Sequence, residues 1–277
     1  PTPLEISQLT SQHPTIVMLR GYYPLESYTT GGGTRNGAAA FANDGFITIA
    51  PDFLGYGDSD PELENSWEAR FVRPLQVLEL IEGITQKGIP VPNALGQTAL
   101  LVPKENEIGM WGHSNGGHIA VSVLQICGKS IPTTLWAPVT APFPYSILYF
   151  GIDQADEGKA QRKWLALLEE DYDVFDFSIS RHMDRLNAPL QLHHGTADEA
   201  VPIVWSNAFS DRIAAENQRR QELEESANET ISVQENLPII DFTYFTYPGA
   251  DHNMQPSWNT VVQRDIQFFT QQLKTAN

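Results

Sequence analysis

Short β-rich runs alternate with helical patterns along most of this chain, and this alternation constrains the fold more than any other feature. The β-rich runs cover residues 15–19, 46–50, 108–111, 133–136, 190–193 and 242–247. Apolar residues recur at helical spacing in the segments 37–43, 66–87, 116–127 and 257–273. The pattern predicts an α/β fold, in which a mostly parallel, doubly wound sheet carries helices on both faces.

One long stretch, residues 138–186, interrupts this alternation. It contains Pro142, Pro144 and several aromatic residues, and we expect a small cap inserted over the carboxyl end of the sheet. The sequence contains no internal repeat or long linker, so residues 1–277 are expected to form a single domain with this cap. Residues 216–236 are charge-dense, which predicts an extended surface helix or a mobile excursion.

Composition excludes several classes of partner. The chain carries 17 basic and 34 acidic residues, a formal charge of −17, which disfavours nucleic acid because phosphate contacts need clustered Lys and Arg. The sequence has no apolar run long enough to predict a membrane span. Cys127 is the only cysteine, so no internal disulfide can form. The chain starts at Pro1 without Met, which indicates a removed leader or a trimmed start, and its low lysine content slightly favours export over a cytoplasmic location.

Ser114 is the strongest candidate for chemistry. It occupies the centre of Gly112-His113-Ser114-Asn115-Gly116, between an apolar β-rich run and a helical pattern. This is the G-x-S-x-G arrangement, in which a strand turns sharply into a helix and exposes the serine at the apex. A serine hydroxyl needs an adjacent base, usually a histidine oriented by a carboxylate. Without such partners, the pentapeptide would be only a tight turn.

Two later strand ends supply those partners in the order acid, then base. Asp198 follows the run 190–193, and His252 follows the run 242–247. The carboxyl ends of parallel strands meet at one edge of a sheet, so both residues are expected near Ser114. Glu199 and Asp251 are competing acids. Asp198 could instead be a turn or helix-capping residue, and His252 a surface-loop histidine.

Metal and cofactor chemistry receive little support from the sequence. His193, His194 and Asp198 could surround a metal on paper, but adjacent histidines on a strand point to opposite faces. Gly31-Gly32-Gly33 lacks the lysine of a phosphate-binding loop. We therefore expect neither metal nor cofactor, and structural roles for His113, His193 and His194.

The chain resembles the α/β-hydrolase superfamily and, within it, the prolyl-oligopeptidase-like and esterase branch. The resemblance rests on residues 112–117, on 194–198 with Val201-Pro202, and on 249–252. It implies Ser114 as nucleophile, His252 as base and Asp198 as orienting acid. The run 15–19 resembles the third strand of that family, so the early N-terminal strands are expected to be short or missing.

The same resemblance assigns an oxyanion hole. One donor should be the backbone N–H of Asn115, at the start of the helix after the nucleophile. The second should come from Arg20-Gly21-Tyr22-Tyr23, where arginine replaces the usual histidine of the family. Tyr22 N–H is the first choice, and Tyr23, through its backbone or its hydroxyl, is the second.

These residues imply acyl transfer to water through an acyl-enzyme, with a small carboxylic ester as substrate. One alternative is a prolyl-oligopeptidase-type peptidase acting on short peptides, although no propeller repeat is present. A second is a non-catalytic, ligand-binding member of the fold. Trp136, Phe143 and Tyr145 are candidates for an apolar substrate pocket, or else they pack the cap. The sequence does not predict an oligomeric state.

Overall fold

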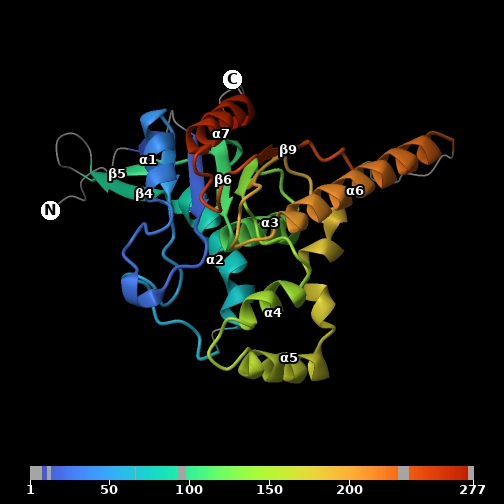
Figure 1. The fold of residues 1–277 in the computed structure, drawn as a ribbon. Coiled ribbons are helices and arrows are strands. Elements are labelled where there is room, and N and C mark those ends of the chain that lie inside the picture. The colour runs from blue at the N-terminus through green and yellow to red at the C-terminus, as the bar shows by residue number, and fades with distance from the viewer. Residues whose placement is uncertain (1–7, 11–13, 66, 93–97, 230–236, 274–277) are drawn as a thin grey trace.

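The computed structural model describes residues 8–10, 14–65, 67–92, 98–229 and 237–273 (Figure 1). Its centre is a six-stranded sheet in the order β3-β2-β6-β7-β8-β9, and every neighbouring pair is parallel. The strands are β2 (Thr15–Leu19), β3 (Ile47–Ile49), β6 (Ile108–His113), β7 (Thr133–Trp136), β8 (Leu190–Gly195) and β9 (Phe242–Tyr247). The α/β fold with a parallel sheet is therefore confirmed.

Helices cover both faces of this sheet. On one face lie α1 (Arg35–Asn43) and α7 (Trp258–Leu273), and on the other lie α2 (Ala69–Lys87), α3 (Asn115–Cys127) and α6 (Ile203–Glu229) (Figure 1). The central strand β6 shows why the chain folds this way. Met110 packs into the α2–α3 side, while the next residue, Trp111, packs into the α1–α7 side. Both faces are thus buried, which is why the strands read as continuous apolar runs.

The predicted elements are found with their ends shifted by at most a few residues. Helix α1 begins two residues before the predicted start at Gly37, and β8 extends to Gly195. The charged segment 216–236 is partly the end of the long helix α6, which the structure describes as far as Glu229. Residues 230–236 lie outside the described residues.

A second, three-stranded sheet was not predicted. It consists of β1 (Gln8–Thr10), β5 (Thr98–Val102) and β4 (Ile89–Pro92), in that order. Strands β1 and β5 are parallel, whereas β4 and β5 are antiparallel. The prolines Pro90 and Pro92 hide β4 in the sequence, because proline is typical of turns and is tolerated only in edge strands such as this one. The early N-terminal strands were expected to be short or missing. The one strand described before β2 is β1, which is three residues long and pairs with β5 outside the main sheet.

The segment between β7 and β8 folds into two helices, α4 (Tyr145–Gly151) and α5 (Lys159–Asp171), and three 3-10 turns, η3 (Val174–Phe177), η4 (Ile179–Arg181) and η5 (Met183–Arg185). Two further 3-10 turns are η1 (Leu25–Ser27) and η2 (Glu105–Glu107). Helices α4 and α5 lie at the end of the molecule away from α1 and α7 (Figure 1). None of the helices in the described ranges is both long enough and apolar enough to cross a membrane.

Candidate active site

Ser114 lies at a strained turn between β6 and α3. Its backbone has φ 56° and ψ −120°, a region that residues with a Cβ rarely adopt. The turn brings backbone segments into close approach, since a Cβ on Gly116 would lie 1.9 Å from the carbonyl oxygen of Leu19. A Cβ on Gly112 would lie 2.6 Å from the carbonyl oxygen of Gly116. The two glycines of the motif are therefore required by space, and they leave Ser114 at the carboxyl edge of the sheet.

Asp198 and His252 form a hydrogen-bonded pair at the same edge. His252 Nδ1 donates to Asp198 Oδ2 at 2.8 Å, and the other carboxylate oxygen accepts from the N–H groups of Ala200 and Val201 at 2.9 and 2.8 Å. The Asp198 side chain is fully buried, whereas the His252 side chain is 20% exposed. The acid is thus fixed by its own loop, and the imidazole keeps an accessible edge.

The competing acids have other positions. Glu199 is exposed, and the Asp251 carboxylate accepts from the backbone N–H groups of Asn253 and Gln255 within its own loop. Asp251 therefore shapes the loop that carries His252, and of these three acids Asp198 is the one that bonds the His252 ring.

His194 is a second histidine that contacts the Asp198 carboxylate. Its Nε2 lies 3.1 Å from Asp198 Oδ2, and its Nδ1 lies 2.7 Å from the hydroxyl of Ser206. Burial raises the pKa of the Asp198 carboxyl, but hydrogen bonds from His194, His252 and the Val201 amide outweigh it and hold that pKa well below its ordinary range. Asp198 is consequently ionised at neutral pH.

His113 connects the Ser114 turn with the His252 loop. Its Nε2 donates to the carbonyl oxygen of His252 at 2.9 Å, and the two rings lie 4.6 Å apart between centroids. Burial, together with the nearby His252, lowers the pKa of His113 to about 4, so this ring is neutral at pH 7. In the described part of the chain, no hydrogen bond joins the Ser114 hydroxyl to the His252 ring.

The loop after β2 lies directly against Ser114. A Cβ on Gly21 would lie 2.9 Å from Ser114 Cβ and 3.4 Å from Ser114 Oγ. The Tyr22 side chain is 80% exposed, and the Tyr23 carbonyl accepts from the Tyr56 hydroxyl at 3.0 Å. The segment predicted to supply the second oxyanion donor therefore lies against Ser114, and its backbone also approaches the first turn of α3, where a Cβ on Gly116 would lie 2.7 Å from the Arg20 carbonyl oxygen.

Arg20 holds this loop from a buried position. It is only 3% exposed, and its guanidinium donates through Nη1 to the Gly21 carbonyl at 3.1 Å and through Nη2 to the Asp52 carbonyl at 2.9 Å. Three aromatic rings enclose it, with distances from the guanidinium carbon to the ring centroids of 4.0 Å for Tyr56, 4.7 Å for Tyr28 and 5.6 Å for Phe53. The arginine that departs from the family pattern is thus the centre of a cation–π cage.

The loop 51–59 completes that cage. The Asp52 carboxylate accepts from the hydroxyls of Tyr28 and Thr30, which fixes the Tyr28 ring over the guanidinium. Sequence reasoning did not find this role for Arg20. The signal in the sequence was the arginine at a position where a histidine is usual. A guanidinium is always charged, so it needs hydrogen-bond acceptors or aromatic rings around it when it is buried.

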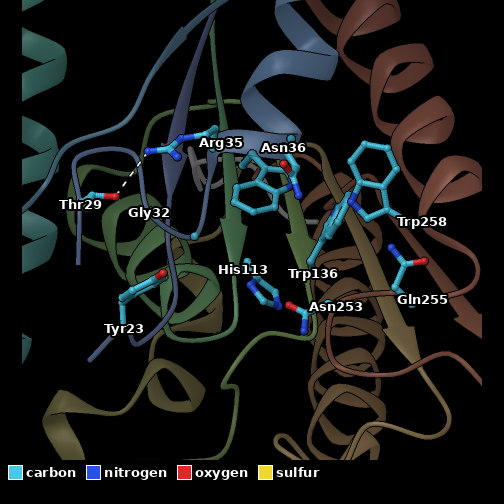
Figure 2. A pocket seen from close by; sticks show the side chains of 13 residues that line it. Tyr23, Thr29, Gly32, Arg35, Asn36, His113, Trp136, Asn253, Gln255 and Trp258 are labelled. Atoms are coloured by element: carbon cyan, nitrogen blue, oxygen red, sulfur yellow. Dashed lines mark hydrogen bonds between the residues drawn. The ribbon is translucent and has the colours of Figure 1, made fainter. Parts of the chain in front are cut away.

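The three candidate pocket residues lie in different surroundings. Trp136 lines a cavity of about 370 Å³ at the carboxyl edge of the sheet (Figure 2). Phe143 is buried in an aromatic cluster, with ring centroids 5.6 Å from Phe71 and 6.2 Å from Phe177. Tyr145 is 60% exposed, and its ring lies 6.3 Å from Phe175. Trp136 lies directly beside Ser114, whose backbone N–H donates to the Trp136 carbonyl at 2.8 Å.

His193 points to the opposite face from His194, as the strand period requires. Its Nε2 lies 2.9 Å from Asp265 Oδ1, and its Nδ1 lies 2.7 Å from the Tyr247 hydroxyl. Asp265 also accepts from Trp136 Nε1 at 2.6 Å. This buried network fixes the orientation of the Trp136 ring.

Comparisons with known proteins agree on the architecture. The sequence matches no protein-family model and no curated protein. Among solved structures, the esterase Est1E from Butyrivibrio proteoclasticus, determined with ferulic acid, is 16% identical with a TM-score of 0.61, over 95% of this chain and 90% of that one. A monoacylglycerol lipase from Paleococcus ferrophilus is 16% identical with a TM-score of 0.54, over 94% and 96%.

A third similar structure is a puromycin-hydrolyzing peptidase of Mycobacterium tuberculosis, 15% identical with a TM-score of 0.61. The likeness covers 96% of this chain but only 35% of the peptidase. Together with the parallel sheet and the strand-to-helix turn at Ser114, these likenesses define the class: the protein has the α/β-hydrolase fold.

Proposed function

We propose that the protein is a serine hydrolase that cleaves carboxylic esters, with Ser114 as nucleophile, His252 as general base and Asp198 as the orienting acid. The observation that carries this proposal is the 2.8 Å contact between His252 Nδ1 and Asp198, at the sheet edge where the strained Ser114 turn ends β6. A buried aspartate bonded to a histidine, close to a half-buried serine turn, is the arrangement that nucleophilic catalysis needs.

Acylation begins when the Ser114 oxygen attacks the carbonyl carbon of the ester and its proton passes to His252 Nε2. Asp198 keeps the Nδ1 proton in place and stabilises the imidazolium, because its carboxylate is ionised. The carbonyl oxygen becomes an oxyanion held by the N–H of Asn115 and by a donor from Tyr22 or Tyr23. The intermediate collapses as His252 protonates the leaving alcohol, and an acyl-Ser114 remains.

Deacylation repeats these steps with water. His252 takes a proton from the water molecule that attacks the acyl carbon, and Ser114 leaves as an alkoxide that regains its proton from the imidazolium. The acid is released and the free site is restored.

Peptide bonds are the second candidate substrate. The likeness to the puromycin-hydrolyzing peptidase favours it, although this chain spans about a third of that protein. The likenesses to Est1E and to the lipase, which cover about nine-tenths or more of both chains, favour esters. The prediction that residues 138–186 form a cap on a single domain, and that Phe143 and Tyr145 contribute to substrate binding, belongs to this same proposal.

Labelling with a fluorophosphonate tests the nucleophile. The adduct is expected on Ser114, the Ser114→Ala variant is expected to lose both label and ester turnover, and Ser122→Ala provides a serine control in α3. Absence of label on Ser114, together with unchanged ester turnover in Ser114→Ala, contradicts Ser114 as the nucleophile. Absence of label together with no ester or amide turnover by the parent protein would favour a non-catalytic, ligand-binding member of the fold. A panel of p-nitrophenyl esters and dipeptidyl amides then separates esterase from peptidase.

A further inference from the structure

The cavity lined by Trp136 lies on the α1–α7 side of the sheet, next to the His252 loop. Its volume of about 370 Å³ falls within the range of small-molecule pockets. His113, which bonds the His252 carbonyl, and Asn253, which directly follows His252, both line it (Figure 2). A ligand in this cavity would therefore lie against the residues that carry Ser114 and His252.

Tryptophan rings provide the apolar part of the cavity. Trp111, Trp136 and Trp258 all line it, and the rings of the first two lie 5.2 Å apart with planes at 70°. The bond to Asp265 holds Trp136 in one orientation. Such preoriented aromatic faces bury a flat apolar surface at little conformational cost.

Polar groups without hydrogen-bond partners among the described residues provide the rest of the cavity lining. Trp111 is 3% exposed and its Nε1 is buried, yet this N–H has no hydrogen-bond partner in the described residues. The side-chain amides of Asn36, Asn253 and Gln255 also line the cavity, and none of them bonds another described residue. A buried N–H donor left unpaired is destabilising, so a ligand that accepts from Trp111 would relieve that loss.

His113 adds an acceptor. Its Nε2 must carry the proton that bonds the His252 carbonyl, and the ring is neutral, so Nδ1 is left with a lone pair. The cavity thus offers both donors and acceptors. Its charged lining residue is the exposed Arg35, which already donates to the Thr30 carbonyl at 3.1 Å, and the chain as a whole is strongly acidic. This composition favours a neutral ligand.

We infer that this cavity binds the pyranose ring of a neutral sugar, and that the esters cleaved at Ser114 are esters of sugar hydroxyls. A pyranose presents an apolar C–H face, which matches the tryptophan rings, and a rim of hydroxyls that both donate and accept, which matches the amides, the Trp111 N–H and His113. The sugar-binding part stands on the cavity alone, whereas its role in substrate recognition rests on the proposed function.

Binding to the Ser114→Ala protein tests the inference without catalysis. Methyl β-D-glucopyranoside and methyl β-D-xylopyranoside are titrated by calorimetry and by saturation-transfer NMR. We expect saturable binding that weakens at least tenfold in Trp258→Ala, and also in the exposed-residue variants Asn36→Ala and Gln255→Ala, for which folding is not at risk. Trp205→Phe, a tryptophan of α6 that contacts Tyr149 and Phe150, is the matched control and should bind as the parent does.

Three results overturn the inference: no saturable binding of either glycoside, equal weakening in the Trp205→Phe control, or binding of free ferulate to this cavity in place of the glycosides. Hydrolysis of p-nitrophenyl acetate by the unmodified protein is measured in parallel. Ester turnover without glycoside binding defeats the sugar assignment alone, whereas glycoside binding without ester turnover defeats the proposed function and leaves the sugar site standing.

Discussion

Replacing Arg20 by lysine is expected to reduce turnover without touching any atom of the Ser114, His252 and Asp198 side chains. The guanidinium reaches two carbonyl oxygens at once, that of Gly21 at 3.1 Å and that of Asp52 at 2.9 Å. A lysine keeps the positive charge among the aromatic rings, but its single ammonium cannot reproduce this fork. Because Gly21 lies against Ser114, loosening its carbonyl moves the loop that would supply the second oxyanion donor.

The expected loss of stability in Arg20→Lys follows from the hydrogen bonds that the lysine cannot make. A hydrogen bond to a charged group contributes about 1.5–3 kcal/mol, and a lysine loses one of the two, so the free energy of unfolding should fall by roughly 2 kcal/mol. Removing one oxyanion donor outright costs about 10²–10³-fold in kcat. A displaced but present donor should cost less, roughly 10–100-fold. KM should change little, since the oxyanion forms only in the transition state.

The assay combines urea unfolding with steady-state hydrolysis of p-nitrophenyl acetate by Arg20→Lys and by a control, Arg162→Lys, whose guanidinium bonds the Glu157 carbonyl in the segment between β7 and β8. The control should match the parent in kcat. Two outcomes refute the reasoning: a kcat for Arg20→Lys equal to that of the parent despite a loss of stability, or a loss expressed in KM alone. Either result would show that the aromatic cage around Arg20 stabilises the fold but does not position the second oxyanion donor.

Further predictions concern acid stability and glycine positions. Because the pKa of Asp198 is depressed, its stabilising contribution is present above its ordinary pKa, about 3.9, and disappears as the pH falls through the depressed value. The stability gap between parent and Asp198→Asn should therefore narrow between pH 5 and pH 2 in urea unfolding, and a constant gap would contradict it. Burial and the nearby Arg70 lower the pKa of His118 to about 3, so this residue also contributes stability above about pH 6.5 that is lost on acidification. The variant His118→Gln should consequently lose less stability than the parent between pH 7 and pH 4, and parallel curves would refute this. Gly116→Ala places a Cβ 1.9 Å from the Leu19 carbonyl and should lower the melting temperature sharply or prevent folding, while Gly83→Ala, in α2 with no atom within 4 Å of the new Cβ, should stabilise by about 0.5–1 kcal/mol. Equal melting temperatures for the two glycine variants would contradict the packing argument.

Local patterns in the sequence were sufficient for the main sheet and the helices around it, but not for the second, three-stranded sheet. Strands β2 and β7 lie where the β-rich runs predict them, and both are buried along their whole length. Strand β9, at the edge of the sheet and only partly buried, is revealed by its aromatic and β-branched residues. The same local reasoning places Asp198 and His252 at strand ends, where parallel topology brings them to one edge. Strand β4 was not predicted, because its two prolines are typical of a turn.

Contacts between distant segments were beyond such reasoning. The cage around Arg20 joins the loop after β2 to loop 51–59, and its geometry depends on how those loops fold over each other. His113 was expected to be structural, and its bond to the His252 carbonyl spans 139 residues. The tryptophan cavity likewise collects residues from β6, β7, α1 and the loop before α7, so its composition could be recognised only in three dimensions.

The central claim is that Ser114 becomes acylated during turnover. Rapid mixing with p-nitrophenyl acetate, followed by acid quench and peptide mass spectrometry, tests it most directly, with His252→Gln as the control that lacks a base. We expect a transient acetyl group on the peptide containing Ser114, formed with a burst of p-nitrophenol and lost at the rate of turnover. Steady release of p-nitrophenol at an undiminished rate in His252→Gln, with no acetyl group on Ser114 in either protein, would contradict it.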